Sequence, residues 1–251
     1  LAALRTRQLA ARDEPPSIFN INLNRRAEIS THISRQTIKA DAAERLFKQD
    51  ASKITWAVID SGIDGKHKAF LNRGEGGGTR ILKAYDFRRL RDLITFGGPD
   101  GQLLKELEAD KEKAAKLKLL QQDVMLGRQL DWTLLEPLLA IDPAIISPPH
   151  PHGTHVAGII GGDLRAGEAE DFDKGDLQGV CPDIRFYDLR VTDATGWGEE
   201  FVIIAALQFL SHVNRHKDEQ RVHGANISLS IRHEVANYAC GQTPVCVQAN
   251  Q

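Results

Sequence analysis

The feature that most constrains the fold is a short apolar run, I-T-W-A-V-I at Ile54 to Ile59, which ends at D-S-G. Its β-branched and aromatic residues show no polar alternation, which is typical of a strand buried on both faces of a parallel sheet. Similar strands are predicted at Ile184 to Val191 and Ala225 to Ile231, separated by helices at His152 to Gly162 and Glu199 to Val213. Because strands and helices alternate, we predict an α/β fold with a mostly parallel β-sheet flanked by helices.

The N-terminal region departs from this alternating pattern. Residues 1–35 are polar and are broken by Pro15-Pro16, which predicts an N-terminal extension ahead of a domain at residues 36–251. A four-residue spacing of apolar side chains predicts a helix from Thr37 to Lys48 at the start of that domain.

A helical insertion is predicted at about residues 88–146, where the composition changes. Its first part predicts one long charged amphipathic helix over residues 103–126, and a second helix follows from Trp132 to Leu139. The apolar side of the long helix is formed by Leu107, Ala114, Leu117, Leu120 and Val124. The sequence leaves two roles open, a hairpin that covers the domain surface or an arm that binds a partner.

The charge balance disfavours two classes of partner. The chain has 32 basic and 34 acidic residues, a net charge of −2, so no overall field attracts nucleic acid or an anionic membrane. No apolar run reaches membrane-spanning length, and charges interrupt the first sixteen residues, so neither an anchor nor a signal peptide is predicted. The sequence begins at Leu1 rather than Met, and the localisation is left unknown.

Two further motifs carry chemistry. Asp60 ends the first predicted strand, where a carboxylate is held rigidly, and His152 opens the H-G-T-H-V-A-G-I-I-G-G segment after a proline-rich approach. An imidazole can take a proton from a hydroxyl and return it to a leaving amine, while a carboxylate fixes its tautomer and stabilises the imidazolium. An Asp-His pair of this kind requires a nucleophilic serine.

The order of these motifs resembles that of the subtilisin-like serine peptidases: D-S-G-I-D after a strand, then H-G-T-H-V-A-G, then G-V-C-P before another strand. The resemblance implies that Asp60 is the orienting carboxylate and His152 the general base, with His155 structural. It also implies binding of an extended peptide or protein substrate between two edge segments, matched here by Gly196-Trp197-Gly198 and Ser228-Leu229-Ser230. Ser230 departs from the family pattern, in which a glycine follows the leucine, and Trp197 is either a lid over a substrate side chain or an exposed loop residue.

The family's serine and oxyanion motifs are absent from this sequence. Neither a downstream G-T-S nor an A-A-G-N-like segment occurs, and Ser61 belongs to the turn of Asp60. The domain is therefore expected to be incomplete at the C-terminus, inactive alone and dependent on a missing C-terminal part of the same domain. The alternative is a non-catalytic peptide-binding or scaffold module.

Competing interpretations of the same residues are weaker. D-S-G also occurs in aspartic peptidases, but a second such motif is missing. His150, His152 and His155 lack the H-E-x-x-H spacing of a zinc site, and no cofactor is required by the proposed chemistry. Asp171, Asp173 and Asp176 are weak calcium candidates in an acidic loop, in a region where several relatives hold calcium, although their spacing is not that of an EF-hand.

A glycine-rich segment and three cysteines can also be interpreted from the sequence. R-G-E-G-G-G-T-R at residues 73–80 lacks the lysine of a phosphate loop and is interpreted as a flexible connection. Cys181 is expected to be a small buried residue. Cys240 and Cys246 are close enough in sequence to form a disulfide in an oxidising compartment, but we predict that the cysteines are free thiols.

Overall fold

The structure, a computed structural model, describes residues 35–74, 77–168, 176–215, 221–230 and 241–250. These residues belong to one compact unit, Thr31–Gln251. The predicted N-terminal extension lies outside the described residues except for Arg35, so its boundary stays a prediction.

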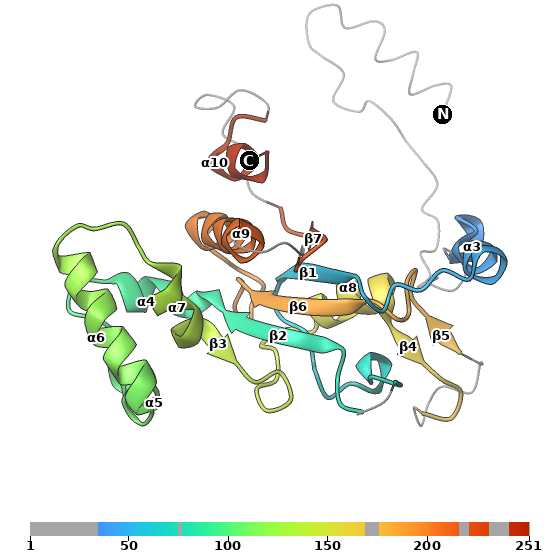
Figure 1. Ribbon diagram of the computed structural model, residues 1–251, viewed down its shortest axis with the longest axis horizontal. Helices are drawn as coiled ribbons and strands as arrows, with labels where there is room; N and C mark the ends of the chain where they lie inside the picture. Colours follow the sequence, from blue (N-terminus) through green and yellow to red (C-terminus); the bar gives the residue numbers. More distant parts are fainter. Residues whose placement is uncertain (1–34, 75–76, 169–175, 216–220, 231–240, 251) are drawn as a thin grey trace, which may run out of the picture. The chain divides into compact units, whose positions relative to one another are not determined.

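A five-stranded sheet forms the centre of the described domain, in the order β3-β2-β6-β1-β7 (Figure 1). Its strands are β1 (Thr55–Asp60), β2 (Ile81–Asp86), β3 (Ala140–Ile141), β6 (Arg185–Arg190) and β7 (Gly224–Ile227). β2, β6, β1 and β7 run parallel, and only β3 is antiparallel to its neighbour. The mostly parallel α/β fold predicted from the sequence is thus present, with β2 and β3 as strands that the sequence pattern did not predict.

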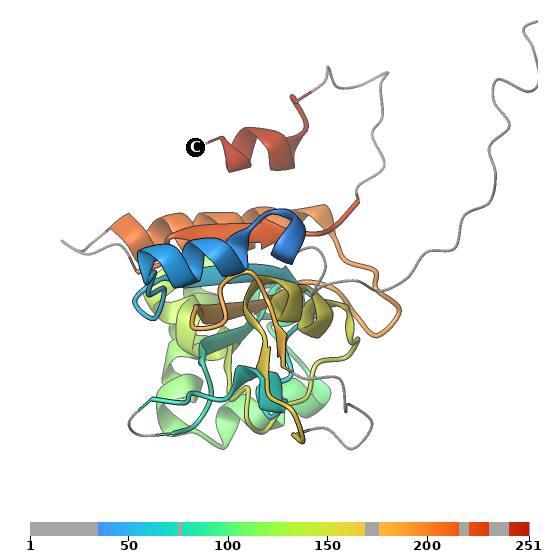
Figure 2. The same ribbon diagram turned by 90° about the vertical axis from the view of Figure 1, so that its right-hand side faces the viewer.

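Two short strands form a separate pair beside this sheet. β4 (Asp163–Leu164) and β5 (Leu177–Gln178) are antiparallel and frame the loop that follows α8 (His152–Gly161). Figure 2 shows this pair next to α8.

Helices cover both faces of the sheet. The α-helices are α3 (Ala40–Phe47), α4 (Leu90–Ile94), α5 (Gly101–Glu108), α6 (Lys111–Met125), α7 (Trp132–Leu139), α8, α9 (Glu200–Arg215) and α10 (Pro244–Ala249), and the 3-10 helices are η1 (Lys68–Phe70) and η2 (Phe87–Arg89). No helix in the described part of the chain has the length and apolar character needed to cross a bilayer.

Two apolar clusters pack on opposite faces of the sheet, and the alternating side chains of β1 contribute to both. Successive side chains of a strand point to opposite faces. Ala57 and Ile59 therefore join the larger apolar cluster with residues of α9, α6 and α7, while Val58 joins the smaller cluster under α8. Because all three side chains are buried, the strand is fixed from both sides and its carboxyl end is a rigid support.

The predicted long helix over residues 103–126 is wrong in one respect, because the structure divides it into α5 and α6. α5 ends at Glu108, and Asp110 caps α6, since its Oδ1 accepts hydrogen bonds from the backbone N–H groups of Glu112 at 2.9 Å and Lys113 at 3.2 Å. An apolar stripe still continues across the break, with Leu107 and Leu120 fully buried.

The helices between β2 and β3 pack on the domain itself. Leu135, Leu138 and Leu139 of α7 are fully buried in the same cluster as the inner side of α9. Gln121 of α6 donates a hydrogen bond to the carbonyl of Leu93 at 2.5 Å, which ties α6 to α4. This packing accords with the covering-hairpin role, and the status of the region as an insertion stays a prediction.

The first predicted helix is shorter than expected. It was predicted from Thr37 to Lys48 and is formed from Ala40 to Phe47, between Lys39 and Lys48, which both have positive φ. None of its residues is buried, and Leu46 and Phe47 are exposed. The amphipathic spacing thus predicts the helix correctly, but the apolar side of that helix is not buried against any of the described residues.

Candidate active site

The centre of the site is a hydrogen-bonded pair, Asp60 and His152. His152 Nδ1 lies 2.8 Å from Asp60 Oδ1 and 3.0 Å from Asp60 Oδ2. Asp60 ends β1 and is 1% exposed, whereas His152 opens α8 and its side chain is 44% exposed. A carboxylate can only accept, so the proton of a neutral imidazole lies on Nδ1 and Nε2 is left as the basic nitrogen.

Ser61 fixes the turn that connects this pair. Its N–H donates to Asp60 Oδ1 at 2.7 Å, and its Oγ donates to the carbonyl of His150 at 2.9 Å. The same Oγ accepts a hydrogen bond from the N–H of Gly153 at 2.9 Å. Ser61 is buried, and its hydroxyl is fully engaged in joining the end of β1 to the start of α8.

Two glycines allow the end of β1 and the start of α8 to approach closely. A Cβ on Gly153 would lie 2.5 Å from the carbonyl oxygen of Gly62, closer than real side chains approach. Gly62 has a φ of +114°, and a Cβ there would lie 2.6 Å from Nε of Arg190. Glycine is therefore required at both positions by backbone contact and conformation.

Arg190 braces the loops that carry the pair. Its fully buried guanidinium donates to the carbonyls of Ile146 at 2.9 Å and Ser147 at 3.0 Å, ahead of α8, and to that of Ile63 at 3.4 Å, beyond Asp60. Nε also donates to Asp188 Oδ2 at 3.0 Å.

Asp188 is the buried counter-ion of Arg190. Burial raises the pKa of its carboxyl to about 6, and the charge of Arg190 opposes that rise. Its second oxygen, Oδ1, has no hydrogen-bond partner among the described residues. The charge on Asp188 therefore depends on Arg190 for compensation.

A cleft of about 670 Å³ opens beside the pair. The described residues that line it are Asp60, Ser61, His150, His152, Thr192, Thr195, Gly196, Trp197, Gly198, Glu200, Ile203, Ser228, Leu229 and Ser230. The structure thus brings every residue of the two predicted substrate-binding segments into the same cleft as Asp60 and His152.

The first edge segment, Gly196-Trp197-Gly198, is a tight turn organised by Asp193. Asp193 Oδ1 accepts hydrogen bonds from Thr195 N–H at 2.8 Å and Trp197 N–H at 3.1 Å, and the N–H of Asp193 donates to the carbonyl of Trp197 at 2.8 Å. The backbone N–H and carbonyl of Trp197 therefore both form hydrogen bonds within the turn. Its side chain is 72% exposed at the cleft, which leaves the indole as the part that can meet a ligand.

The second edge segment, Ser228-Leu229-Ser230, directly follows β7. That strand pairs with β1 on one side and has no second partner among the described strands. Asn226 Nδ2 donates to Ser228 Oγ at 2.8 Å, and Leu229 is half-buried against the larger core. The segment borders the same cleft as the Trp197 turn.

Sequence reasoning missed several residues of this region, among them Arg190, Glu200 and His150 as a cleft residue. The available signal for Arg190 was its spacing of two residues from Asp188, which puts two opposite charges on one face of a strand, since a buried charge needs buried partners. For Glu200 the signal was its place directly after an edge segment at the start of a helix.

The three histidines near the site do not converge. His150 Nδ1 accepts a hydrogen bond from the backbone N–H of His152 at 3.2 Å, and the two ring centres are 6.4 Å apart. His155 is exposed one turn along α8. Across the described ranges, no group of three potential ligands is arranged to hold a metal ion.

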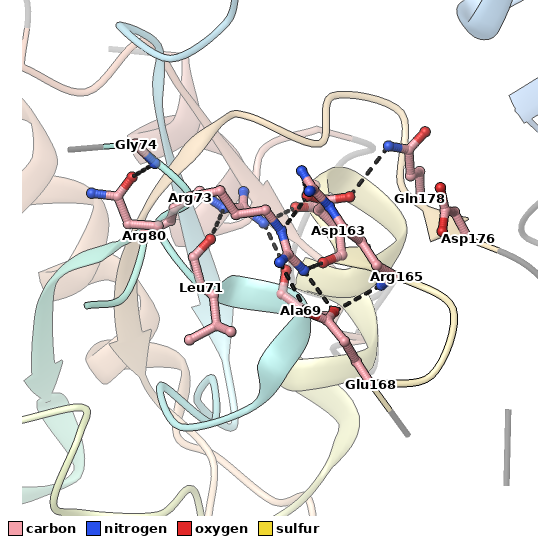
Figure 3. A network of polar contacts seen from close by, with 12 residues as sticks. Ala69, Leu71, Arg73, Gly74, Arg80, Asp163, Arg165, Glu168, Asp176 and Gln178 are labelled. Carbon is pink, nitrogen blue, oxygen red and sulfur yellow. Dashed lines mark hydrogen bonds and ion pairs between the residues drawn. The ribbon is translucent and has the colours of Figure 1, made fainter. Parts of the chain in front are cut away.

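The loop after α8 is organised by an arginine (Figure 3). Arg73 donates to Asp163 Oδ2 at 2.6 Å, and to both carboxylate oxygens of Glu168 at 2.6 and 2.9 Å. These hydrogen bonds lower the pKa of Glu168 to about 2. The charges of both carboxylates, Asp163 and Glu168, are thus compensated by the guanidinium of Arg73.

Of the calcium candidates, only Asp176 lies among the described residues, and its Oδ1 accepts a hydrogen bond from Ala166 N–H at 3.0 Å. Asp171 and Asp173 lie outside them. The described donors do not fit a calcium site, and the calcium expectation stays a prediction. In the segment 73–80, interpreted from the sequence as a flexible connection, Arg80 is buried and donates hydrogen bonds to four carbonyls.

The described cysteines are free thiols. Cys181 was expected to be buried and is half-buried, and burial raises the pKa of its thiol. Cys246 is also half-buried. Cys240 lies outside the described residues.

The fold and the pair together define a class of protein: an α/β domain that presents a carboxylate-oriented imidazole to an open cleft at the carboxyl end of a parallel strand. The model of the subtilase family matches residues 51–246, so the chain belongs to the subtilase family, a family of serine peptidases.

Among solved structures, the CspB protease of Clostridium perfringens matches with 21% sequence identity and a TM-score of 0.48, over 86% of this chain and 37% of that chain. The chain thus spans about a third of the length of that protease. No curated protein sequence matches the chain.

Proposed function

We propose that this chain provides the acid-base half of a subtilisin-type serine endopeptidase. Asp60 is the orienting carboxylate and His152 the general base. The observation that carries the proposal is the 2.8 Å contact between His152 Nδ1 and Asp60 Oδ1, which keeps Nε2 basic and directed away from the carboxylate. Membership of the subtilase family supports peptide-bond hydrolysis as the reaction.

In the proposed reaction, His152 Nε2 takes the proton of a serine hydroxyl as its oxygen attacks the peptide carbonyl. The imidazolium that forms is stabilised by Asp60, and it then gives its proton to the leaving amine. Burial of Asp60 keeps water away from the carboxylate and strengthens this electrostatic contribution.

The nucleophile in this proposal comes from residues outside this sequence. No hydroxyl in the described part of the chain hydrogen-bonds to His152 Nε2, and Ser61 is committed to the turn. The sequence also has no G-T-S motif and no asparagine in the expected oxyanion context. The chain alone is therefore expected to be inactive, since it lacks both the nucleophile and an oxyanion donor worth about 3 kcal/mol of barrier height.

The substrate in this proposal is an extended peptide. Gly196 to Gly198 and Ser228 to Ser230 border one cleft with the pair, so a peptide laid between them passes His152. Pairing with backbone groups at the edges of the cleft, other than those of Trp197, accepts many side chains, which suits a peptidase.

A fluorophosphonate probe tests the proposal. The isolated chain should not be labelled, whereas the chain joined to a downstream segment that carries a G-T-S serine should be labelled. His152→Ala in the joined protein should abolish labelling, and Asp60→Asn should slow it about 10⁴-fold. Labelling of the isolated chain would refute the missing-nucleophile claim, and Ser228→Ala and Ser230→Ala would then identify an internal nucleophile. An unlabelled joined protein that still binds peptides would favour the non-catalytic module.

A further inference from the structure

The cleft carries one charge that the proposed chemistry does not use, the carboxylate of Glu200. This residue is the first of α9, is half-buried, and lines the cleft with Trp197 and Ile203. Its Oε1 is buried and has no hydrogen-bond partner in the described part of the chain. A buried carboxylate oxygen without a partner is costly, so this carboxylate carries an uncompensated charge at the wall of the cleft.

The neighbouring charges do not compensate Glu200. Arg91 donates two hydrogen bonds to Glu199 Oε2 and Oε1, at 3.0 and 2.7 Å, and its guanidinium lies 5.1 Å from the centre of the Phe201 ring. Its charge is thus committed to the adjacent glutamate, which does not line the cleft. Glu199 and Glu200 differ in this respect although they are consecutive.

The described lining of the cleft contains two carboxylates, Asp60 and Glu200, two histidines, His150 and His152, and no lysine or arginine. Asp60 is held by His152, so Glu200 is the carboxylate left for a substrate. A cationic side chain would find a counter-ion there, and the exposed indole of Trp197 can hold the same cation against its ring face.

We propose that Glu200 selects peptides with a lysine or arginine side chain at this end of the cleft. Ile203 and Leu229, which also line the cleft, suit the apolar stem of such a side chain. The inference rests on the proposed function, because it names the substrate class of the same peptide cleft.

Binding of matched peptides to the chain tests the inference without any need for turnover. A set of extended eight-residue peptides, each with lysine or norleucine at one scanned position, is titrated by fluorescence anisotropy. At one position the lysine peptide should bind about tenfold more tightly or better, as expected for a hydrogen bond to a charged group. The preference should weaken as salt is raised.

Glu200→Gln should reduce that preference to less than about twofold, whereas Glu199→Gln, the matched control one residue earlier, should retain it. Thermal melts of both variants establish that they are folded. If wild-type chain binds both peptides of every pair equally, or Glu200→Gln keeps the preference, the inference is overturned while the peptide cleft stands. If no peptide binds, the cleft of the proposed function fails together with the inference.

Discussion

Replacing Arg190 by methionine should destabilise the domain by about 4 kcal/mol at pH 8. The side chain is fully buried, and its removal leaves Asp188 as an uncompensated buried charge, which typically costs about 3–5 kcal/mol. The carbonyls of Ile146 and Ser147 also lose their donor. The free energy of unfolding from urea titration measures the effect.

The pH dependence of this loss separates the charge from the packing. Burial raises the pKa of Asp188 to about 6 in the folded chain, above its ordinary value near 4 in an unfolded one. The folded state therefore keeps a proton that the unfolded state releases, and stability falls as pH rises through this window. Without Arg190 the folded pKa rises further, so the deficit of Arg190→Met should shrink by at least about 1 kcal/mol between pH 8 and pH 5.

Arg80 provides the matched control for this experiment. It is another buried arginine, and it donates to the carbonyls of Ile184, Ala69 and Gly161 at 2.6, 2.7 and 2.6 Å. Arg80→Met should also destabilise the domain, but with a deficit that stays constant from pH 5 to pH 8. Equal pH profiles for the two variants would refute the assignment of Asp188 as the charge that depends on Arg190.

Three further predictions concern a backbone contact at the site, an ion pair in the loop after α8 and the packing of α7. Gly153→Ala should cost about 1–3 kcal/mol, because its Cβ would meet backbone at 2.5 Å, whereas Gly158→Ala, with open space around its Cβ, should be neutral or stabilising; equal denaturation midpoints would contradict this. Arg73→Gln should lower the melting temperature more at pH 7 than near pH 2, because the depressed pKa of Glu168 gives stability that is fully present above about pH 4.5 and is lost as the pH falls through about 2; a pH-independent difference would contradict it. Leu138→Ala should cost about 2–5 kcal/mol in urea unfolding, and a loss below 1 kcal/mol would show that α7 is peripheral to the core.

Local patterns predicted the parts of the fold that local physics determines. The apolar run before Asp60 predicts a strand buried on both faces, and the structure confirms it, because Ala57 and Ile59 of β1 are buried in one apolar cluster and Val58 in the other. Capping decided the division between α5 and α6, where the apolar stripe continues but Asp110 prefers to cap a new helix. The sequence pattern did not predict β2, because Lys83 interrupts its short apolar run. The strand forms through its parallel backbone pairing with β6, which a local pattern does not show.

The site was predictable only where its residues lie next to recognisable motifs. Asp60 and His152 were selected from such motifs, and the structure places them in contact. Arg190 could not be given a role from sequence, because its partners at Ile63, Ile146 and Ser147 are 43 to 127 positions away along the chain. Glu200 and Glu199 look alike in sequence, and they are distinguished by the ion pair of Glu199 with Arg91 and by the place of Glu200 in the cleft lining.

The pairing of Asp60 with His152 is tested most directly by the tautomer of the neutral His152 ring, measured by nitrogen-15 NMR of the imidazole rings with His152→Gln for assignment. We predict a proton on Nδ1 and none on Nε2 of the neutral ring, and loss of that preference in Asp60→Asn. A wild-type chain that carries its proton on Nε2 at pH 8 would contradict the claim that Asp60 prepares His152 to act as a base.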